Sequence, residues 1–253
     1  MYSILMAMIL ATHEPIIIAH QGGANQAPEN TIAAFQKCLD QGLTFFECDV
    51  RLSKEGIPVI IHNPTTELYI KEEKEVQFLT LEEIRKLDAG SHFSQEYKGE
   101  KIPTLKEILD LLVDKGTIML ELKYNEPRPK LLVKRVMEPL ETYPKKKVIL
   151  GSFSPAIVAE VRKQNPDIPL IGIADQTKYL QKLLDLGLDH IALDVDFATE
   201  DLVEALMNQN VKVWIWTVNS LIDFHKFHSL KVGGIITDEP YRFHLELQMR
   251  KSL

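Results

Sequence analysis

The sequence predicts a single-domain α/β protein with the architecture of a (β/α)8 TIM-type barrel, somewhat irregular in one place. Short runs rich in Ile, Val and Leu alternate with segments of helical period, which is typical of βα units around a parallel sheet. The chain has 253 residues, a length that single α/β barrels commonly have, and the alternation continues to the C-terminus without a linker. An open doubly wound sheet is the alternative that this alternation leaves open.

Nine runs have the composition of buried strands, one more than an eight-stranded barrel uses. The surplus run lies between residues 45 and 62, where RLSKEG is too short to hold a crossover helix and Gly56 marks a turn. We therefore expect a hairpin-like connection at this point. The predicted strands are 16–20, 45–50, 58–62, 117–122, 148–152, 169–173, 190–195, 212–218 and 234–237.

The segments between these strands carry the signals that start and stop helices. In the segment 30–42, Asn30 is the predicted N-cap and Gly42 the predicted stop. Thr80 and Thr104 are predicted to cap the next two helices in the same way. Further helices are expected to begin near residues 129, 154, 177 and 199.

Charge and hydropathy limit the classes of partner. The net charge of -7 argues against a broad nucleic-acid surface, which needs clustered lysine and arginine. Hydrophobic residues make up 45% of the chain, enough for a sizeable core, yet no run approaches the length needed to span a bilayer. We therefore expect neither nucleic-acid binding nor stable membrane insertion, and the composition leaves the oligomeric state unknown.

The N-terminus stands apart from the barrel pattern. The stretch MYSILMAMILAT is apolar but lacks a basic start and a clean small-residue cleavage site. We interpret 1–15 as an N-terminal extension or a weak signal-like segment, and 16–253 as the barrel domain. Cys38 and Cys48 are too few for a disulfide framework, which favours a reduced compartment. A cytoplasmic location is therefore expected, while secretion or a periplasmic location stays open.

Histidines close two of the predicted strands. The run IIIAH ends in His20, and the run PVIIH ends in His62. In a barrel the carboxyl ends of the strands form the mouth where catalysis takes place. A lone histidine at a strand end is usually an ordinary polar residue that meets solvent, so these two gain meaning only if other polar strand ends converge with them.

Acidic residues on two other strands supply that convergence. Glu47 and Asp49 share one strand face because residues two apart point the same way, and Glu121 shares a face with Lys123. Three carboxylates aimed into one mouth would repel one another unless a cation lay among them, and hard oxygen ligands suit Mg²⁺ or Ca²⁺. One such pair alone more often marks a solvated strand face, but the combined set predicts a functional site.

The same residues lie in motifs that resemble a known family, the glycerophosphodiester phosphodiesterases, which are metal-dependent (β/α)8 barrels. The resemblance runs from about residue 16 to 240. So many ordered pieces with fitting spacing are far more specific than one short motif. The matching motifs are AHQGG, PENT, AAF, ECDVRLSKEG, VIIHN, LTLEEIRKLDAG, GEKIPTLKEILDLL, LELK, GSF, WTVN and GIITDEP.

The resemblance implies hydrolysis of a small-molecule glycerophosphodiester to glycerol 3-phosphate and an alcohol, with either water or a hydroxyl of the substrate as the nucleophile. It also implies a divalent metal cofactor, Mg or Ca. Core packing is the other interpretation of the aromatic residue in this set. The implied roles are metal binding by Glu47, Asp49 and Glu121, acid and base catalysis by His20 and His62, phosphate binding by Lys123 and Gln21, and lining of the substrate pocket by Trp216.

Two positions depart from the family pattern. The family has His-Arg-Gly where this chain has Gln21 in the middle position, so a neutral amide replaces a charged, bidentate donor. Charged hydrogen bonds are stronger than neutral ones by an amount that corresponds to a loss on the order of tenfold in binding or rate. Asn63 stands after His62 where the family usually has an acidic residue, and we expect this change to alter how His62 is oriented.

Arg51 is a candidate to compensate for the missing charge. Strand period places it on the face that carries Glu47 and Asp49, from which it could contact a phosphate. Exposure to solvent beyond the end of the strand is the simpler expectation, because arginine is mostly exposed in proteins.

Other functions stay open besides the implied hydrolase. Gln21 and Asn63 motivate a catalytically weakened relative that acts as a phosphodiester-binding or interaction module. A hydrolase of lysophospholipids is a further alternative, because an acyl chain could lie along the barrel rim. An enolase-type proton abstractor would need its carboxylates on consecutive strands and a separate capping domain, and the sequence indicates neither.

Overall fold

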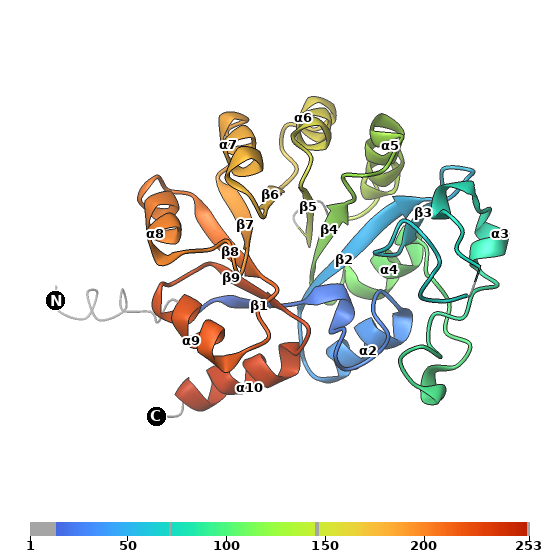
Figure 1. Ribbon diagram of the computed structural model, residues 1–253, viewed down its shortest axis with the longest axis horizontal. Helices are drawn as coiled ribbons and strands as arrows, with labels where there is room; N and C mark the ends of the chain where they lie inside the picture. The colour runs from blue at the N-terminus through green and yellow to red at the C-terminus, as the bar shows by residue number, and fades with distance from the viewer. Residues whose placement is uncertain (1–13, 71, 145–146, 252–253) are drawn as a thin grey trace.

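Eight parallel strands close into a barrel in the computed structural model, which describes residues 14–70, 72–144 and 147–251 (Figure 1). Closure is direct, because the first strand pairs with both the second and the last. The predicted (β/α)8 barrel is confirmed, and the open doubly wound alternative is wrong. The barrel strands are β1 (Ile16–Ala19), β2 (Phe45–Leu52), β4 (Thr117–Leu122), β5 (Val148–Ser152), β6 (Leu170–Ala174), β7 (His190–Asp194), β8 (Lys212–Trp216) and β9 (Gly234–Thr237).

Helices connect the strands and surround the barrel (Figure 1). No helix in the described ranges is long and apolar enough to cross a membrane. Most of the predicted extension 1–15 falls outside the described residues. The helices are α2 (Ile32–Asp40), α3 (Leu81–Ile84), α4 (Leu105–Leu112), α5 (Pro129–Leu140), α6 (Pro155–Gln164), α7 (Thr177–Asp185), α8 (Glu200–Asn208), α9 (Leu221–Ser229) and α10 (Pro240–Lys251), with short 3-10 turns η1 (His20–Gly22), η2 (Val76–Phe78) and η3 (Gln95–Tyr97).

The ninth strand, β3 (Pro58–Ile60), pairs antiparallel with the end of β2, as the short connection predicts. Leu52 is opposite Pro58 and Val50 is opposite Ile60. Gly56 has φ of +79° in the turn, a value that glycine adopts without strain. The irregularity predicted between residues 45 and 62 is therefore a β-hairpin added to the barrel.

The chain makes an excursion beside the barrel between β3 and α4, and this excursion packs around a small core of its own. Ile61, Ile84 and Ile102 are among the buried residues of this core. The helix predicted to follow Thr80 ends after four residues. After it the Lys86 and Leu87 amides bond three residues back, and the chain then turns at Asp88, whose side chain accepts hydrogen bonds from the following backbone amides.

Helix caps agree with the sequence at two of three positions. Thr80 and Thr104 each form a complete capping box. Asn30 is not a cap, because Thr31 takes that place and its hydroxyl accepts a hydrogen bond from the Ala34 amide. Asn30 instead adopts a left-handed φ of 59°, which carries its side chain toward β2.

The capping box of α4 gives a stability test. Thr104→Ala is expected to lower the free energy of unfolding by about 1 kcal/mol, because the Glu107 backbone amide loses the hydroxyl that accepts its hydrogen bond. The melting temperature should fall by about 2–4 °C. Thermal and urea unfolding followed by circular dichroism measure the change. Thr177→Ala is a matched control, since Gln176 caps that helix, and an equal loss in both variants would contradict the assigned role.

An apolar layer fills the barrel beneath its mouth. Met119, Ile173, Ala192 and Ile236 belong to this inner cluster and are almost fully buried. The larger core lies between the strands and the surrounding helices and includes Cys48. The polar residues at the strand ends therefore lie next to an apolar layer that excludes water, so charges placed there are weakly screened.

Candidate active site

Three carboxylates from two neighbouring strands meet in the barrel mouth. Glu47 and Asp49 lie on β2, and Glu121 lies on β4 directly opposite Asp49 in the register. Their exposed fractions are 3%, 1% and 8%, and one oxygen of each lies within 4.8 Å of the others. The convergence that the period-two pattern predicts is therefore present in the structure.

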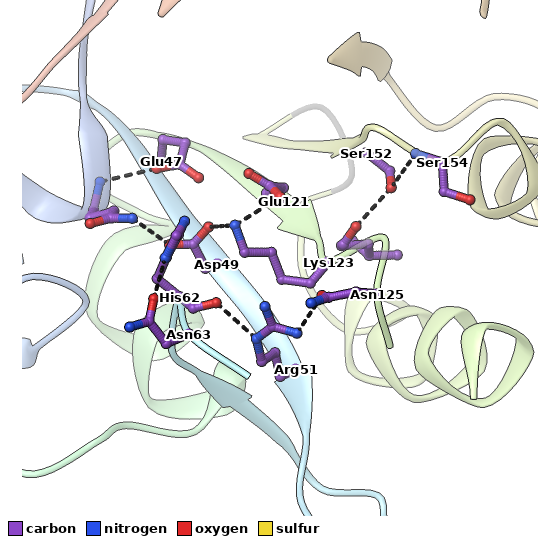
Figure 2. A network of polar contacts seen from close by, with 12 residues as sticks. Glu47, Asp49, Arg51, His62, Asn63, Glu121, Lys123, Asn125, Ser152 and Ser154 are labelled. Atoms are coloured by element: carbon purple, nitrogen blue, oxygen red, sulfur yellow. Dashed lines mark hydrogen bonds and ion pairs between the residues drawn. The ribbon is translucent and has the colours of Figure 1, made fainter. Parts of the chain in front are cut away.

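Lys123 lies among these carboxylates (Figure 2). Its Nζ is 2.8 Å from Asp49 Oδ1 and 2.9 Å from Glu121 Oε1. Burial opposes the charge on the ammonium, but the two carboxylates outweigh burial and raise the pKa of Lys123 above its usual value. Burial alone would raise the pKa of Asp49. The positive charge of Lys123 outweighs burial and holds this carboxyl pKa below its usual range.

The cluster still carries more negative charge than this one lysine offsets. Burial, with Asp49 beside it, raises the pKa of Glu47 to about 8. Lys123 contacts Asp49 and Glu121, whereas Glu47 has the Gln21 amide at 3.0 Å and His20 at 4.0 Å as its partners. An oxygen-only set of three buried carboxylates that shares one ammonium fits a hard divalent cation.

The turn that follows β1 orders one side of the cluster. Gln21 has a left-handed φ of 52°, and its backbone amide donates to Glu47 Oε2 at 3.0 Å. Gly22 follows with φ of +82°, and a Cβ at this position would lie 2.9 Å from the Cβ of Ala34. Only glycine fits there, because helix α2 packs directly against the turn.

Asp49 receives two side-chain amides from this same region. The Gln21 Nε2 donates to Asp49 Oδ2 at 2.9 Å, and Asn30 Nδ2 donates to the same oxygen at 2.8 Å. The structure thus places the Gln21 side chain on a carboxylate, and its exposed fraction is only 8%. Sequence reasoning missed Asn30 because its position suggested a helix cap, although it lies within the PENT motif.

His20 is held by another carboxylate, Asp238, which directly follows the neighbouring strand β9. Its Nδ1 lies 2.6 Å from Asp238 Oδ1, and Asn219 Nδ2 donates to the other oxygen of Asp238 at 2.7 Å. Burial would lower the pKa of His20, but the bond to Asp238 and the charge of Glu47 outweigh burial and raise the pKa to about 9. Asp238 had no predicted role, although its place directly after β9 was the available signal.

His62 follows β3, so the added hairpin carries it to the mouth. Its Nδ1 lies 2.7 Å from Asn63 Oδ1 (Figure 2). The Asn63 Nδ2 donates to Glu67 at 2.7 Å. The amide oxygen of Asn63 thus contacts the imidazole as an acidic neighbour would, but without a charge. This departure from the family pattern keeps a contact that orients His62.

Arg51 is buried, so the expectation that it lies in solvent is wrong. Its exposed fraction is 5%. The Nε donates to the backbone oxygen of His62 at 2.8 Å, and Nη1 donates to Asn125 Oδ1 at 2.7 Å (Figure 2). The strand is the reason, because β2 continues to Leu52 and pairs Arg51 with Val59 of β3.

A cavity of about 580 Å³ opens beside these groups. Six of the residues singled out in the sequence line it, namely His20, Arg51, His62, Glu121, Lys123 and Trp216. The indole of Trp216 is partly exposed there, and its Nε1 donates to the backbone oxygen of Ala192 at 3.3 Å. Gln21 does not belong to the described lining of this cavity.

The barrel and its polar mouth define the chain as an enzyme of the TIM-barrel class. The sequence profile of the Glycerophosphoryl diester phosphodiesterase family matches residues 20–242. A glycerophosphodiester phosphodiesterase from Caldanaerobacter subterraneus subsp. tengcongensis is 34% identical over 230 residues, which cover 89% of this chain and 94% of that protein. The chain therefore belongs to the glycerophosphoryl diester phosphodiesterase family, and it is a phosphoric diester hydrolase.

Solved structures agree with this placement. A phosphodiesterase from Oleispira antarctica, in complex with the product sn-glycerol-3-phosphate, has a TM-score of 0.87 and 27% sequence identity, with 93% of this chain and 97% of that chain covered. A protein from Silicibacter pomeroyi described as a "Putative glycerophosphoryl diester phosphodiesterase" has a TM-score of 0.82 and 25% identity, with 92% of this chain and 94% of that chain covered.

Proposed function

We propose that this chain hydrolyses glycerophosphodiesters to glycerol 3-phosphate and an alcohol, with one divalent cation, Mg²⁺ or Ca²⁺, held by Glu47, Asp49 and Glu121. The observation that carries the proposal is the meeting of three buried carboxylates with two histidines beside one cavity. When bound, the cation would offset the charge of the phosphodiester and the further charge that develops during the reaction.

Lys123 and Arg51 supply the positive charge that this chain itself brings to the phosphate. Both line the cavity and both are held in place by hydrogen bonds or ion pairs. Gln21 was expected to bind phosphate as well, but its side-chain amide is engaged by Asp49. We therefore assign Gln21 to the support of a metal-binding carboxylate and Arg51 to the phosphate.

His20 and His62 carry the proton transfers. One imidazole accepts the proton of the attacking oxygen, and the other donates a proton to the leaving alcohol oxygen. Both side chains line the cavity, and each has its Nδ1 fixed by an oxygen partner. We therefore assign the proton transfers to Nε2, which in His20 lies 4.0 Å from Glu47 Oε2. Trp216 lines the pocket for the organic part of the substrate.

The test is an assay with and without a chelator. Glycerophosphocholine should yield glycerol 3-phosphate in the presence of Mg²⁺ or Ca²⁺, and an excess of EDTA should abolish the release until metal is restored. Enzymatic detection of glycerol 3-phosphate measures the product. If neither glycerophosphocholine nor diesters with other head groups are cleaved while metal still binds by calorimetry, the chain is the phosphodiester-binding alternative.

Asn63 gives a finer test of the proton-transfer assignment. Asn63→Ala is expected to lower kcat/KM for glycerophosphocholine by about three- to tenfold, because His62 loses one neutral hydrogen bond that orients it. Metal affinity measured by calorimetry should stay the same, since the partners of Asn63 among the described residues are His62 and Glu67 and not the three metal-binding carboxylates. A fall in metal affinity of similar size would contradict the assignment.

A further inference from the structure

The cavity is divided by charge between its two sides. Its cationic groups lie over β1 to β4, where Arg51 and Lys123 join the two histidines. The opposite side follows β5, β6 and β8 and presents the aromatic residues Phe153, Tyr179 and Trp216. A substrate phosphate on the first side leaves its organic group to lie along the second.

Three aromatic rings form a row that begins at Tyr124, just after β4, and continues along the second side through Phe153 to Trp216. The rings of Tyr124 and Phe153 have centroids 5.6 Å apart, and those of Phe153 and Trp216 are 5.4 Å apart and nearly perpendicular. Tyr124 is 60% exposed and Tyr179 is 37% exposed. Ring surface of this extent at a pocket wall is available to a ligand.

Asp175 adds a negative charge to the aromatic wall. It follows β6 directly, is exposed and lines the cavity. Within the described ranges it has neither a hydrogen bond nor an ion pair, whereas Glu121, the other carboxylate of the lining, contacts Lys123. A carboxylate free of partners beside open aromatic rings is the environment that attracts an organic cation.

We propose that this wall is a subsite for the ammonium group of an alkylammonium head group, choline or ethanolamine. The inference rests on the proposed phosphodiester hydrolysis and specifies its substrate class. Such a diester is a zwitterion in which two carbons separate the phosphate from the nitrogen. Its anion fits the Arg51 and Lys123 side of the cavity, and its cation fits the side of Asp175 and the rings. A glycerol or inositol head group has no charge for this wall to bind.

The experiment measures head-group selectivity, the ratio of kcat/KM for glycerophosphocholine to that for glycerophosphoglycerol. The wild-type ratio should exceed one, and Asp175→Asn should lower it about three- to tenfold, as expected for one partly exposed cation contact. Asp185→Asn is the matched control, because it removes the same charge at the other end of α7, where Asp185 pairs with Gln181.

A second pair of variants tests the rings. Tyr179→Leu should lower the selectivity ratio, while Tyr179→Phe should keep it, since only the aromatic face attracts the cation. Equal ratios in all variants, or a wild type without preference for choline, would overturn the subsite. Equal cleavage of lysophosphatidylcholine and lysophosphatidylglycerol, unaffected by Asp175→Asn, would also overturn it and assign the wall to an acyl chain.

The same comparison can be made without turnover. Glycerophosphocholine and glycerophosphoglycerol are titrated by calorimetry into the wild type and into Asp175→Asn, both in EDTA. A choline preference that the substitution reduces would support the subsite even if no diester were cleaved, so failure of the proposed hydrolysis and failure of the subsite are distinguishable. Equal affinities for both ligands would overturn the subsite.

Discussion

Glu47→Gln is expected to lower kcat/KM for glycerophosphodiesters by at least about a hundredfold, the largest effect among the substitutions considered. The amide has nearly the same shape as the carboxylate but cannot supply its charge to a divalent cation. Its oxygen can still accept the Gln21 amide that Glu47 accepts at 3.0 Å. Steady-state assays over a range of Mg²⁺ and Ca²⁺ concentrations give the change, and calorimetry gives the metal affinity.

Stability separates this loss from misfolding. Without metal the variant should unfold at the same temperature as the wild type or higher, because three buried carboxylates repel one another and share one lysine. Saturating metal should raise the melting temperature of the wild type but not of the variant. A variant that keeps both its activity and its metal-dependent stabilisation would remove Glu47 from the metal site.

Arg51→Ala is expected to lower kcat/KM by about 10- to 100-fold, because a charged hydrogen-bond donor beside the phosphate is worth about 1.5–3 kcal/mol. Arg51→Lys should lose less activity than Arg51→Ala, because lysine keeps the positive charge but lacks the planar, bidentate guanidinium. Asn125→Ala is the matched control for structure, since it removes the guanidinium partner at 2.7 Å and leaves the charge in place.

Gln21→Arg tests whether Arg51 supplies the positive charge that is missing at position 21. In the Arg51→Ala background this substitution should restore part of the lost activity, while in the wild type it should add little. The restoration is a coupling between the two positions that a double-mutant cycle measures. If Gln21→Arg raises the activity of both backgrounds by the same factor, Arg51 does not stand in for the missing arginine.

Much of the fold could be predicted from local sequence. Buried strands of four to eight residues, with turn residues between them, are recognisable because parallel strands in a barrel are apolar on both faces. The hairpin at residues 45 to 62 was predictable because a six-residue connection cannot hold a crossover helix. The early end of the helix after Thr80 was not, since the chain continues in bonds to the third residue back and then in a turn at Asp88, whose side chain accepts the Gly90 amide.

The candidate site, like the fold, could be predicted only in part. Period two fixes which face of β2 holds Glu47 and Asp49, so their convergence with Glu121 followed once a barrel was assumed. Period two says nothing about where a strand ends. Because β2 runs two residues beyond the predicted limit, Arg51 lies inside the ladder and not in solvent. Asn30 depends on a left-handed backbone angle, which the sequence pattern does not report.

The hairpin has a consequence for how this barrel could change in evolution. One of the two imidazoles, His62, is carried by the added hairpin, whereas His20 directly follows β1, a strand of the closed barrel. That hairpin packs against the separate small core that contains Ile61, Ile84 and Ile102. Replacements in this side core would shift His62 by fractions of an ångström while the eight-strand frame stays intact, which offers a route to new reaction rates that leaves the metal ligands untouched.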